Sequence, residues 1–600
     1  MKKIIPWLLV ISLALSAFLP AGAEQLGEKE YPGLYEAAAV SALMPVFDSV
    51  GEVTAKTVPL YLGRLDQVSQ ITLYFMNGCM DVPFVNAEEI APLLESVINT
   101  PNDNGVRCTN SILGSCLIIT RENGASAMID FTDQTITVDE LNRFYAPAGE
   151  YYGIDAARDI KPTGSDAYSF LNKTAVYVRS GSQTVFRLGD YHIPMPLVEH
   201  TGYLPLATVS DLFFSDNYIN LAYNGVNAFA LEYGTVDVYE KDVENTMSHL
   251  YFDCPKGEKS EQLARMTYNE LCMVLDRFYG LKEEHHVDSF DRLFIETGIV
   301  DRLLNTDPAK TYEGLSELTM GFFRDGHSAV TVPSHLTDGF ENSAETMNYV
   351  MMSAMKSLLN MITWQNARDR FYPDGVPGYE EVEDTAYITF DSFLRDPERL
   401  YREGDITNNP LDTLELILYA NEQIHRENSP VRNVVLDLTM NGGGMADTAL
   451  YTVCWLLGST PITILDTADG TESTLIYDFD ADRSGSFMDA EDSLDPMTNR
   501  VYCLISPISF SCGNLVPSVL KDSGRATLIG QTSGGGACAV LPLITADGAL
   551  IAISGHSRIS YVKNGIFYSV DEGITPDVFV NDPAHLYDRQ YLTNLIRQLP

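Results

Sequence analysis

The sequence predicts a multidomain α/β protein, and three observations support that prediction. The chain has 600 residues, which is too long for a single hydrophobic core. Short strand-like runs separated by turn residues dominate up to about residue 245, and strand-like and helix-like segments alternate from about residue 384. Between them lie segments with the apolar spacing of amphipathic helices. We therefore expect a strand-rich mixed α/β accessory domain over 24–245, a helical segment over 246–380, and an α/β core with a helix-covered sheet over 381–600.

The first 23 residues have the pattern of a secretory signal peptide. Lys2 and Lys3 precede an apolar stretch from Ile4 to Leu19, and small residues follow as far as Ala23. We expect cleavage after Ala23 and a secreted, extracytoplasmic protein. No later stretch reaches the ~18 apolar residues of a membrane span, so no span is expected.

Composition restricts the partners of the chain. It has 82 acidic and 39 basic side chains, a formal net charge of −43. Such a charge opposes binding to nucleic acid and to an anionic membrane surface. The hydrophobic fraction of 45% is typical of packed globular domains rather than of a disordered chain.

The expected elements follow the three parts in order. In the accessory domain, 71–98 and 174–213 have the pattern of hairpins followed by short helices. Amphipathic helices are expected over 260–281, 289–304, 310–325 and 343–364. The core is expected to have strands at 385–393, 431–438, 500–509 and 525–531, helices at 409–428, 445–458 and 513–524, and a terminal hairpin at 548–570.

A glycine run follows one of the core strands. Gly442, Gly443 and Gly444 come after the strand 431–438 and before the next helix. Consecutive glycines expose backbone N–H groups, which at a helix start can hold an anion. The anion could be a phosphate or the oxyanion of a reaction intermediate. No GxGxxG or Walker pattern accompanies the run, which weakens the phosphate interpretation.

A second strand-to-helix turn contains Ser511. Its position places the N–H of Cys512, at the start of the following helix, near the serine hydroxyl. Serine at such a turn is commonly a helix N-cap. It becomes a nucleophile only when a base takes its proton.

The candidate bases are ten histidines and a few lysines. His327 lies in a tight Arg-Asp-Gly-His turn immediately before an apolar segment. After Ser511 the only lysines are Lys521 and Lys563, and Lys521 is expected on a solvated helix face. No HExxH spacing and no close Cys/His pairs are present, so no metal and no organic cofactor are expected.

The nine cysteines are odd in number and widely spaced, which does not describe a disulfide scaffold. Cys108 and Cys116 are close enough in sequence for a local disulfide, and the sequence leaves that bridge open.

Four segments, in this order, resemble the tail-specific or C-terminal processing serine peptidase family: NVVLDLTMNGGG, SFSCGN, GRATLIGQTSGGG and EGITPDV. The resemblance covers about 260–600 and is strongest from residue 430. In that family the nucleophilic serine lies thirteen residues before a Gly-Arg pair, the position of Ser511 relative to Gly524. One branch has its lysine base twenty-five residues after the serine, where this chain has Gly536. The chain is more similar to the branch of tricorn protease and the chlamydial protease-like activity factor, in which a histidine follows a DxH pattern, as His327 does here.

This resemblance implies a crotonase-like or ClpP-like core and a serine endopeptidase that acts on protein or peptide substrates. Ser511 would be the nucleophile and His327 the general base. An acidic residue near the GxxPD motif would orient the imidazole, and both Asp571 and Glu572 are candidates. The oxyanion would be held by N–H groups of Gly443, Gly442 and Cys512.

Two alternatives remain open from the sequence. One is a catalytically inactive peptide- or protein-binding protein on the same fold, which the missing lysine and the imperfect position of the acid favour. The other is a Ser–Lys mechanism through Lys521 or Lys563.

Overall fold

A computed structural model describes residues 41–63, 67–98, 106–145, 158–159, 168–238, 240–337, 358–396, 399, 401–402, 404–487, 491–495 and 497–599. The predicted signal peptide and the first half of the predicted helix 343–364 lie outside these residues. The multidomain α/β class is confirmed, with several mixed sheets and helices packed on them. No helix in the described part of the chain has the length and apolarity needed to cross a membrane.

The N-terminal part is built on two sheets, with α2 (Ile90–Ile98), α3 (Leu141–Tyr145) and α4 (Leu206–Phe213) among its helices. The larger sheet has the spatial order β12 (Leu197–Val198), β13 (Thr201–Pro205), β3 (Phe84–Asn86), β2 (Gln67–Met76), β1 (Val53–Leu62), β15 (Ala228–Glu232) and β14 (Ile219–Tyr223). The smaller sheet has the order β11 (Thr184–Arg187), β7 (Thr135–Val138), β6 (Ser126–Asp130), β5 (Cys116–Arg121) and β4 (Cys108–Leu113). A short separate pair is formed by β8 (Arg158–Asp159) and β9 (Tyr168–Ser169).

The segment over 246–380, predicted to be helical, contains several helices. Its elements are α5 (Met247–Phe252), α6 (Glu261–Phe278), α7 (Phe290–Thr297), α8 (Val300–Leu303), α9 (Pro308–Ser316) and a π-helix at Glu317–Phe323. Ser260 and Ser289 cap α6 and α7, because each side chain accepts a hydrogen bond from the N–H three residues later. Residues 358–369 form a further helix.

The core sheet has the order β17 (Tyr379–Val382), β18 (Thr385–Thr389), β19 (Asn433–Asp437), β22 (Arg500–Ile505), β23 (Ala526–Gly530) and β27 (Val578–Phe579). It is parallel from β18 to β27. Its helices are α11 (Thr413–His425), α12 (Ala446–Leu457), α13 (Cys512–Asp522) and α14 (Arg589–Ile596). Because β19 and β22 are parallel neighbours, the turns after them lie at the same edge of the sheet. This places the glycine run beside the Ser511 turn.

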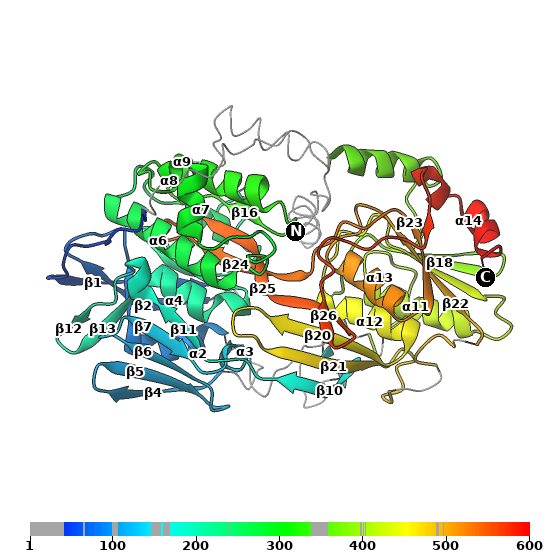
Figure 1. Ribbon diagram of the computed structural model, residues 1–600, viewed down its shortest axis with the longest axis horizontal. Helices are drawn as coiled ribbons and strands as arrows, with labels where there is room; N and C mark the ends of the chain where they lie inside the picture. The colour runs from blue at the N-terminus through cyan, green and yellow to red at the C-terminus, as the bar shows by residue number, and fades with distance from the viewer. Residues whose placement is uncertain are drawn as a thin grey trace.

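A third large sheet connects the two halves of the molecule (Figure 1). Its strands are β10 (Leu171–Arg179), β21 (Glu472–Phe479), β20 (Thr460–Asp466), β25 (Leu550–Lys563) and β16 (Ala329–Val332), with β24 (Cys538–Ile544) and β26 (Ile566–Tyr568) also paired to β25. Residues from all three predicted parts therefore share one sheet. The predicted boundaries at 245 and 380 divide the sequence but do not separate the hydrogen-bonded strands.

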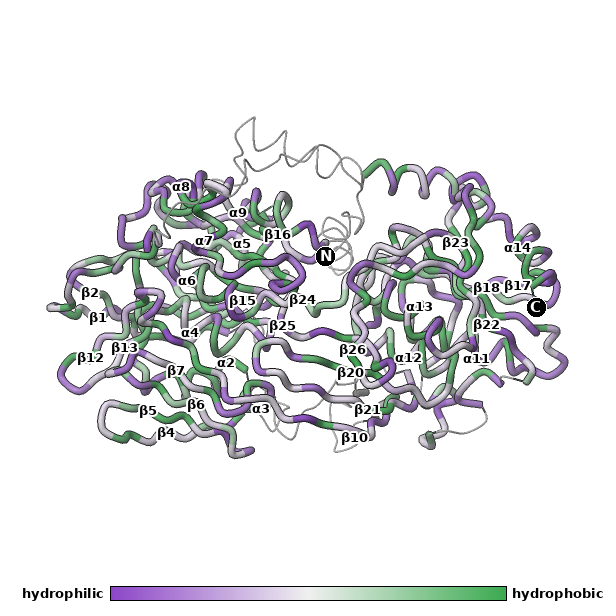
Figure 2. Tube along the Cα trace, in the orientation of Figure 1, coloured by the Kyte–Doolittle hydropathy of each residue, from purple (hydrophilic) through white to green (hydrophobic). Residues whose placement is uncertain are grey.

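Apolar packing follows the same arrangement. One core cluster joins the N-terminal sheets, α6, α7 and the C-terminal strands β24 and β25. A second fills the space between the core sheet, α11, α12 and α13. Hydrophobic stretches run along the strands and helices inside both halves, while the outer loops are mostly hydrophilic (Figure 2).

The hairpin β4–β5 shows that Cys108 and Cys116 do not form a disulfide. In its register Cys108 pairs with Arg121, while Cys116 pairs with Leu113, so the two cysteines lie at opposite ends of the hairpin. All nine cysteines are free thiols.

A buried ion pair joins the helical segment to the C-terminal hairpin. Lys259 Nζ donates to Asp547 Oδ2 at 2.9 Å and to Thr311 Oγ1 at 2.6 Å, and both charged side chains are fully buried. Lys259→Met should lower the free energy of unfolding by ~3–5 kcal/mol, because it leaves Asp547 buried without its counter-charge. Lys259→Met combined with Asp547→Leu should restore most of the loss, measured by chemical denaturation and by hydrogen exchange of 544–550. Equal losses in the single and double variants would contradict this account.

Candidate active site

Ser511 has a strained main-chain conformation between β22 and α13. Its φ of 54° and ψ of −122° lie in a region that a residue with a Cβ rarely adopts. Such a conformation costs ~1–3 kcal/mol and is typically found where function requires it. The Ser511 N–H donates to Gly535 O at 2.8 Å, and its carbonyl accepts from the N–H of Asn514. These bonds hold the half-buried serine at the start of the helix.

The two neighbouring serines, Ser506 and Ser509, make hydrogen bonds to the main chain. Ser506 Oγ donates to Thr439 O at 2.5 Å and Ser509 Oγ to Leu438 O at 2.7 Å, and both side chains are fully buried. They join the turn after β22 to the turn after β19. Of the three serines in this segment, Ser511 is the one at the helix start, and its side chain makes no N-cap hydrogen bond. The N-cap interpretation of Ser511 is therefore wrong.

The glycine run packs directly against the serine. A Cβ added to Gly443 would lie 2.7 Å from Ser511 Cβ and 3.1 Å from its Oγ, and the φ of 106° at Gly443 itself favours glycine. The Gly443 N–H donates to Asn441 Oδ1 at 2.9 Å, and the Gly442 N–H donates to Asp391 O at 3.2 Å. Both of these predicted oxyanion donors are therefore already hydrogen-bonded in this conformation and are not available to an oxyanion.

Other N–H groups of the two turns remain available. The Cys512 N–H donates to no acceptor among the described residues, and the Gly444 N–H faces the sulfur of Cys512 rather than a backbone acceptor. Cys512 lies at the first position of α13, where an N–H has no partner within the helix. Its thiol is buried, which raises the pKa of that thiol to about 12, and donates to Gly444 O at 3.3 Å.

His327 is positioned by a turn that Asp325 stabilises. Asp325 Oδ1 accepts from the N–H groups of His327 and Ser328, and its Oδ2 accepts from Ser328 Oγ and Tyr279 OH. Arg324, at φ 50°, and Gly326, at φ 76°, reverse the chain between the π-helix and β16. The sequence singled out Arg-Asp-Gly-His as a tight turn, but did not show that Asp325 fixes it.

The His327 imidazole packs against the serine turn. Its ring centroid lies 4.7 Å from that of Phe510, the residue before Ser511. A Cβ on Gly536 would lie 3.2 Å from His327 Cε1 and 2.8 Å from the Phe510 ring. The histidine ring therefore lies beside the position where the lysine branch of the resembling family carries its base. Gly536 is the last residue of a second glycine run, Gly534 to Gly536. Ser511 bonds to Gly535 and His327 packs against Gly536, so the serine, the histidine and this run meet in one place.

The electrostatic environment keeps His327 neutral. The side chain is 2% exposed, and neither ring nitrogen has a hydrogen-bond partner among the described residues. Burial lowers the pKa of His327 to about 4, and the nearby negative charge of Asp325 only partly opposes this. At neutral pH the ring is therefore an uncharged imidazole with a nitrogen able to accept a proton.

The structure distinguishes the two candidate acids. Asp571 is half-buried beside the second glycine run, where its Oδ1 accepts from the Ala537 N–H at 3.0 Å and its main-chain O accepts from the Gly536 N–H at 3.1 Å. Burial raises the pKa of Asp571 to about 6, and the negative charge of Asp325 acts in the same direction. Glu572 is exposed to solvent. Asp571 therefore lies beside Gly536, which also packs against His327.

A buried polar network joins this acidic segment to α13, the helix that follows Ser511. Asn514, on α13, donates from Nδ2 to Val570 O at 2.7 Å and accepts at Oδ1 from Ser533 Oγ at 2.7 Å. Ser533 Oγ in turn accepts from the Ile574 N–H. No sequence pattern predicted this network, although Asn514 lies within the SFSCGN motif and Ser533 within the TSGGG motif.

The lysines predicted as alternative bases are engaged elsewhere. Lys521 pairs with Asp577 and donates to Thr575 O, and Lys563 pairs with Asp522. The site thus combines a strained serine, a neutral buried histidine, a half-buried acid and free main-chain N–H groups, which are the components of serine-dependent acyl transfer.

Residues 384–580 match Peptidase family S41. Among curated proteins, the Chlamydia pneumoniae protein CPj1016/CpB1054 is 34% identical over 82 residues, which are 14% of this chain and 13% of that one. The match therefore spans only a small part of that relative's length.

Solved structures similar to this chain include mature CPAF and tricorn protease. Mature CPAF is 14% identical, with a TM-score of 0.24 over 36% of this chain and 51% of that chain. Tricorn protease is 12% identical, with a TM-score of 0.30 over 90% of this chain and 57% of that chain.

The burial of His327 leads to a measurable titration. In protein labelled with ¹³Cε1-histidine, the resonance absent from His327→Gln should titrate with a pKa of about 4, well below the usual value for histidine, because burial disfavours the charged ring. A midpoint near ~6.5 would show that the ring is solvated and that the packing against Phe510 and Gly536 is wrong.

Proposed function

We propose that this protein, whose residues 384–580 match Peptidase family S41, is a secreted serine endopeptidase that hydrolyses peptide bonds through an acyl-enzyme on Ser511. The observation that supports this most directly is the strained main chain of Ser511, with φ 54° and ψ −122°, beside a buried neutral histidine. Strand-to-helix turns of this kind present a serine hydroxyl at the edge of a sheet in other hydrolases. Secretion rests on the leader sequence alone.

In the proposed mechanism, Ser511 Oγ attacks the carbonyl carbon of the peptide bond while His327 accepts the hydroxyl proton. The resulting tetrahedral intermediate collapses when the same proton passes from His327 to the leaving amine, which leaves an ester on Ser511. Water then attacks the ester with His327 again as base, and His327 returns this proton to Ser511 Oγ as the ester C–O bond breaks and the acid product departs. A histidine with no internal hydrogen-bond partner can serve both transfers without breaking another contact.

The oxyanion requires at least two N–H donors. We assign one to Cys512, whose N–H is free at the start of α13. The glycine turn supplies the other, either from Gly444 or from Gly443 once its N–H leaves Asn441. Gly442 is the weakest of the predicted donors because its N–H bonds to Asp391 O.

Asp571 is the acid that we assign to His327. In its ionised form it would stabilise the imidazolium that forms during each proton transfer. Its pKa of about 6 means that this ionised form is lost as the pH falls through about 6. Activity should therefore decline on the acidic side of that value, before His327 itself becomes charged.

One observation favours the alternative of a binding protein without turnover. His327 is almost fully buried under Phe510, and neither of its ring nitrogens is bonded to a described group. A ligand peptide could then occupy the site without being cleaved. Kinetics on variants of the serine and histidine distinguish the two functions.

Ser511→Ala and His327→Ala should each abolish cleavage of an unfolded protein substrate. Both members act as one unit, so each loss should reach ~10⁶ in kcat, with a residual rate of ~10³ over water. Lys521→Ala is the matched control and should keep the wild-type rate. Equal digestion by wild type and Ser511→Ala would contradict the assignment.

Asp571→Asn should lower kcat by as much as ~10⁴, because an amide does not stabilise the imidazolium as a carboxylate does. Glu572→Gln should stay near the wild-type kcat, since Glu572 is exposed. Both variants are compared in kcat/KM profiles from pH 4 to 8. If both variants keep a near-normal kcat, another group orients His327. A low kcat in Glu572→Gln with a near-normal kcat in Asp571→Asn would assign the acid to Glu572.

A further inference from the structure

The loop between β21 and β22 contains a sequence pattern that the peptidase mechanism does not use. From Asp480 the chain reads D-A-D-R-S-G, and Glu491 occupies the twelfth position of the same count. This spacing is that of the calcium-binding loop of EF-hands, D-x-[DN]-x-[DN]-G-x₅-E. It departs from the pattern in one ligand, since Ser484 stands at the fifth position. It also departs in context, because β21 rather than a helix precedes it.

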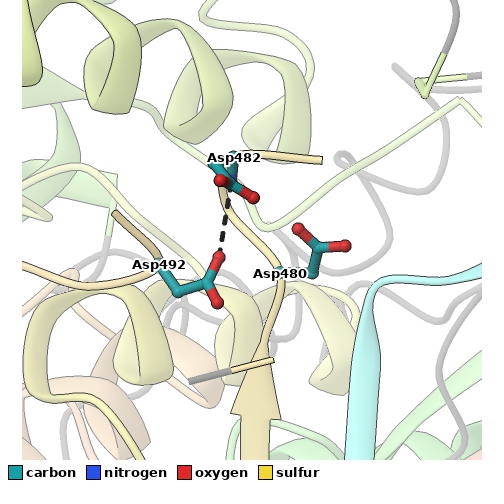
Figure 3. A group of neighbouring side chains, drawn as sticks. All are labelled: Asp480, Asp482 and Asp492. Atoms are coloured by element: carbon teal, nitrogen blue, oxygen red, sulfur yellow. Dashed lines mark hydrogen bonds between the residues drawn. The ribbon is translucent and has the colours of Figure 1, made fainter. Parts of the chain in front are cut away.

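The structure brings oxygen ligands of this loop together independently of the sequence pattern. One carboxylate oxygen each from Asp480, Asp482 and Asp492 lie within 4.8 Å of one another, and the three side chains converge on a common space (Figure 3). Gly485, at the sixth position, has a φ of 86°, which the sharp turn of such a loop requires. Asp492, next to the expected Glu491, provides the acidic group at the end of the loop.

These carboxylates have an arrangement that is unfavourable without a cation. Asp480 is fully buried and accepts from the N–H groups of Ser484 and Gly485, but no basic side chain pairs with it in the described part of the chain. Asp492 is 3% exposed. The basic side chain of the same loop, Arg483, pairs with Glu422 and donates to the carbonyl oxygens of Tyr401 and Gly404. Buried like charges at this distance repel one another, and a divalent cation removes that repulsion.

We propose that residues 480–486 and Asp492 form a binding site for one Ca²⁺ ion, with the carboxylates of Asp480, Asp482 and Asp492 as its charged ligands. All the side-chain ligands are oxygens, which Ca²⁺ prefers, and no histidine or cysteine joins them to favour zinc. The Ser484 hydroxyl and loop carbonyls supply further oxygens, as in EF-hand loops. The sequence predicted no metal, because it lacks the histidine and cysteine spacings of zinc sites.

The site has a structural role away from the catalytic residues. Asn421, on α11, donates from Nδ2 to the carbonyls of Ala481 and Glu491, and Asp492 Oδ1 accepts from the Ala481 N–H. The loop therefore joins β21 of the connecting sheet to β22 of the core sheet while packing on α11. A bound ion would fix this connection, and hence the base of the strand that leads to Ser511.

Calcium binding is measured on the full chain after EDTA treatment, by isothermal titration calorimetry and by thermal unfolding. We expect one Ca²⁺ per chain with a Kd of ~10⁻⁵–10⁻³ M, and a rise in Tm of ~2–5 °C at saturating Ca²⁺. Mg²⁺ at the same concentration should bind at least ~10-fold more weakly, because it demands near-ideal octahedral geometry and gives up its water reluctantly.

Asp480→Asn should lose the calcium-dependent rise in Tm, while its Tm without calcium should equal or exceed that of the wild type, since one repelling charge is gone. Asp482→Asn removes an exposed ligand and should weaken binding at least ~10-fold without affecting folding. Asp374→Asn, an exposed acid outside the loop, is the control for charge. Binding weaker than ~10 mM, or equal binding by wild type and Asp482→Asn, would overturn the proposal.

Discussion

The main-chain conformation of Ser511 is the constraint on which the site depends. A residue with a Cβ does not hold φ 54° and ψ −122° unless neighbouring structure compensates. Here the compensation comes from two interlocked turns. Phe510 N–H donates to Asn441 O, and Ser511 N–H donates to Gly535 O. Asn441, which is fully buried, also donates to Phe390 O, so the glycine turn, the serine turn and β18 are fixed together.

The two glycine runs explain why the remaining groups fit around this turn. Gly443 must lack a side chain because Ser511 occupies the space, and Gly536 must lack one because Phe510 and His327 do. In the sequence, Gly536 stands where the lysine branch of the resembling family has its base. In the structure, the absence of a side chain at Gly536 leaves room for His327, which comes from another element. The π-helix and the Asp325 turn bring that histidine in from a segment 184 residues upstream of Ser511.

The sequence predicted the core as a helix-covered sheet, because its strands are short, apolar and followed by glycine or serine turns. The structure adds that neighbouring strands of this sheet are parallel, so that Ser511 and the glycine run lie at one edge of it. The sequence could not predict the connecting sheet, in which β10 pairs with β21 across about 300 residues, because strand pairing between distant segments leaves no local pattern. The sequence also did not distinguish Asp571 from Glu572. Which of two adjacent acids is buried depends on the distant segments that pack around it.

Hydrogen bonds among buried polar residues were the least visible part of the site. Asn514, Ser533 and Asp325 have no periodic or catalytic signature of their own, yet they connect α13, the second glycine run and the turn of His327. Their partners are main-chain groups and side chains of other segments, whose positions are known only once the fold is known.

The most direct test of an activated Ser511 is covalent labelling with a fluorophosphonate probe, followed by mass spectrometry of the intact chain and of its peptides. The account predicts one adduct per chain, located on Ser511, and its loss in His327→Ala at the same protein and probe concentrations. An unlabelled wild-type protein, or labelling that does not depend on His327, would contradict it.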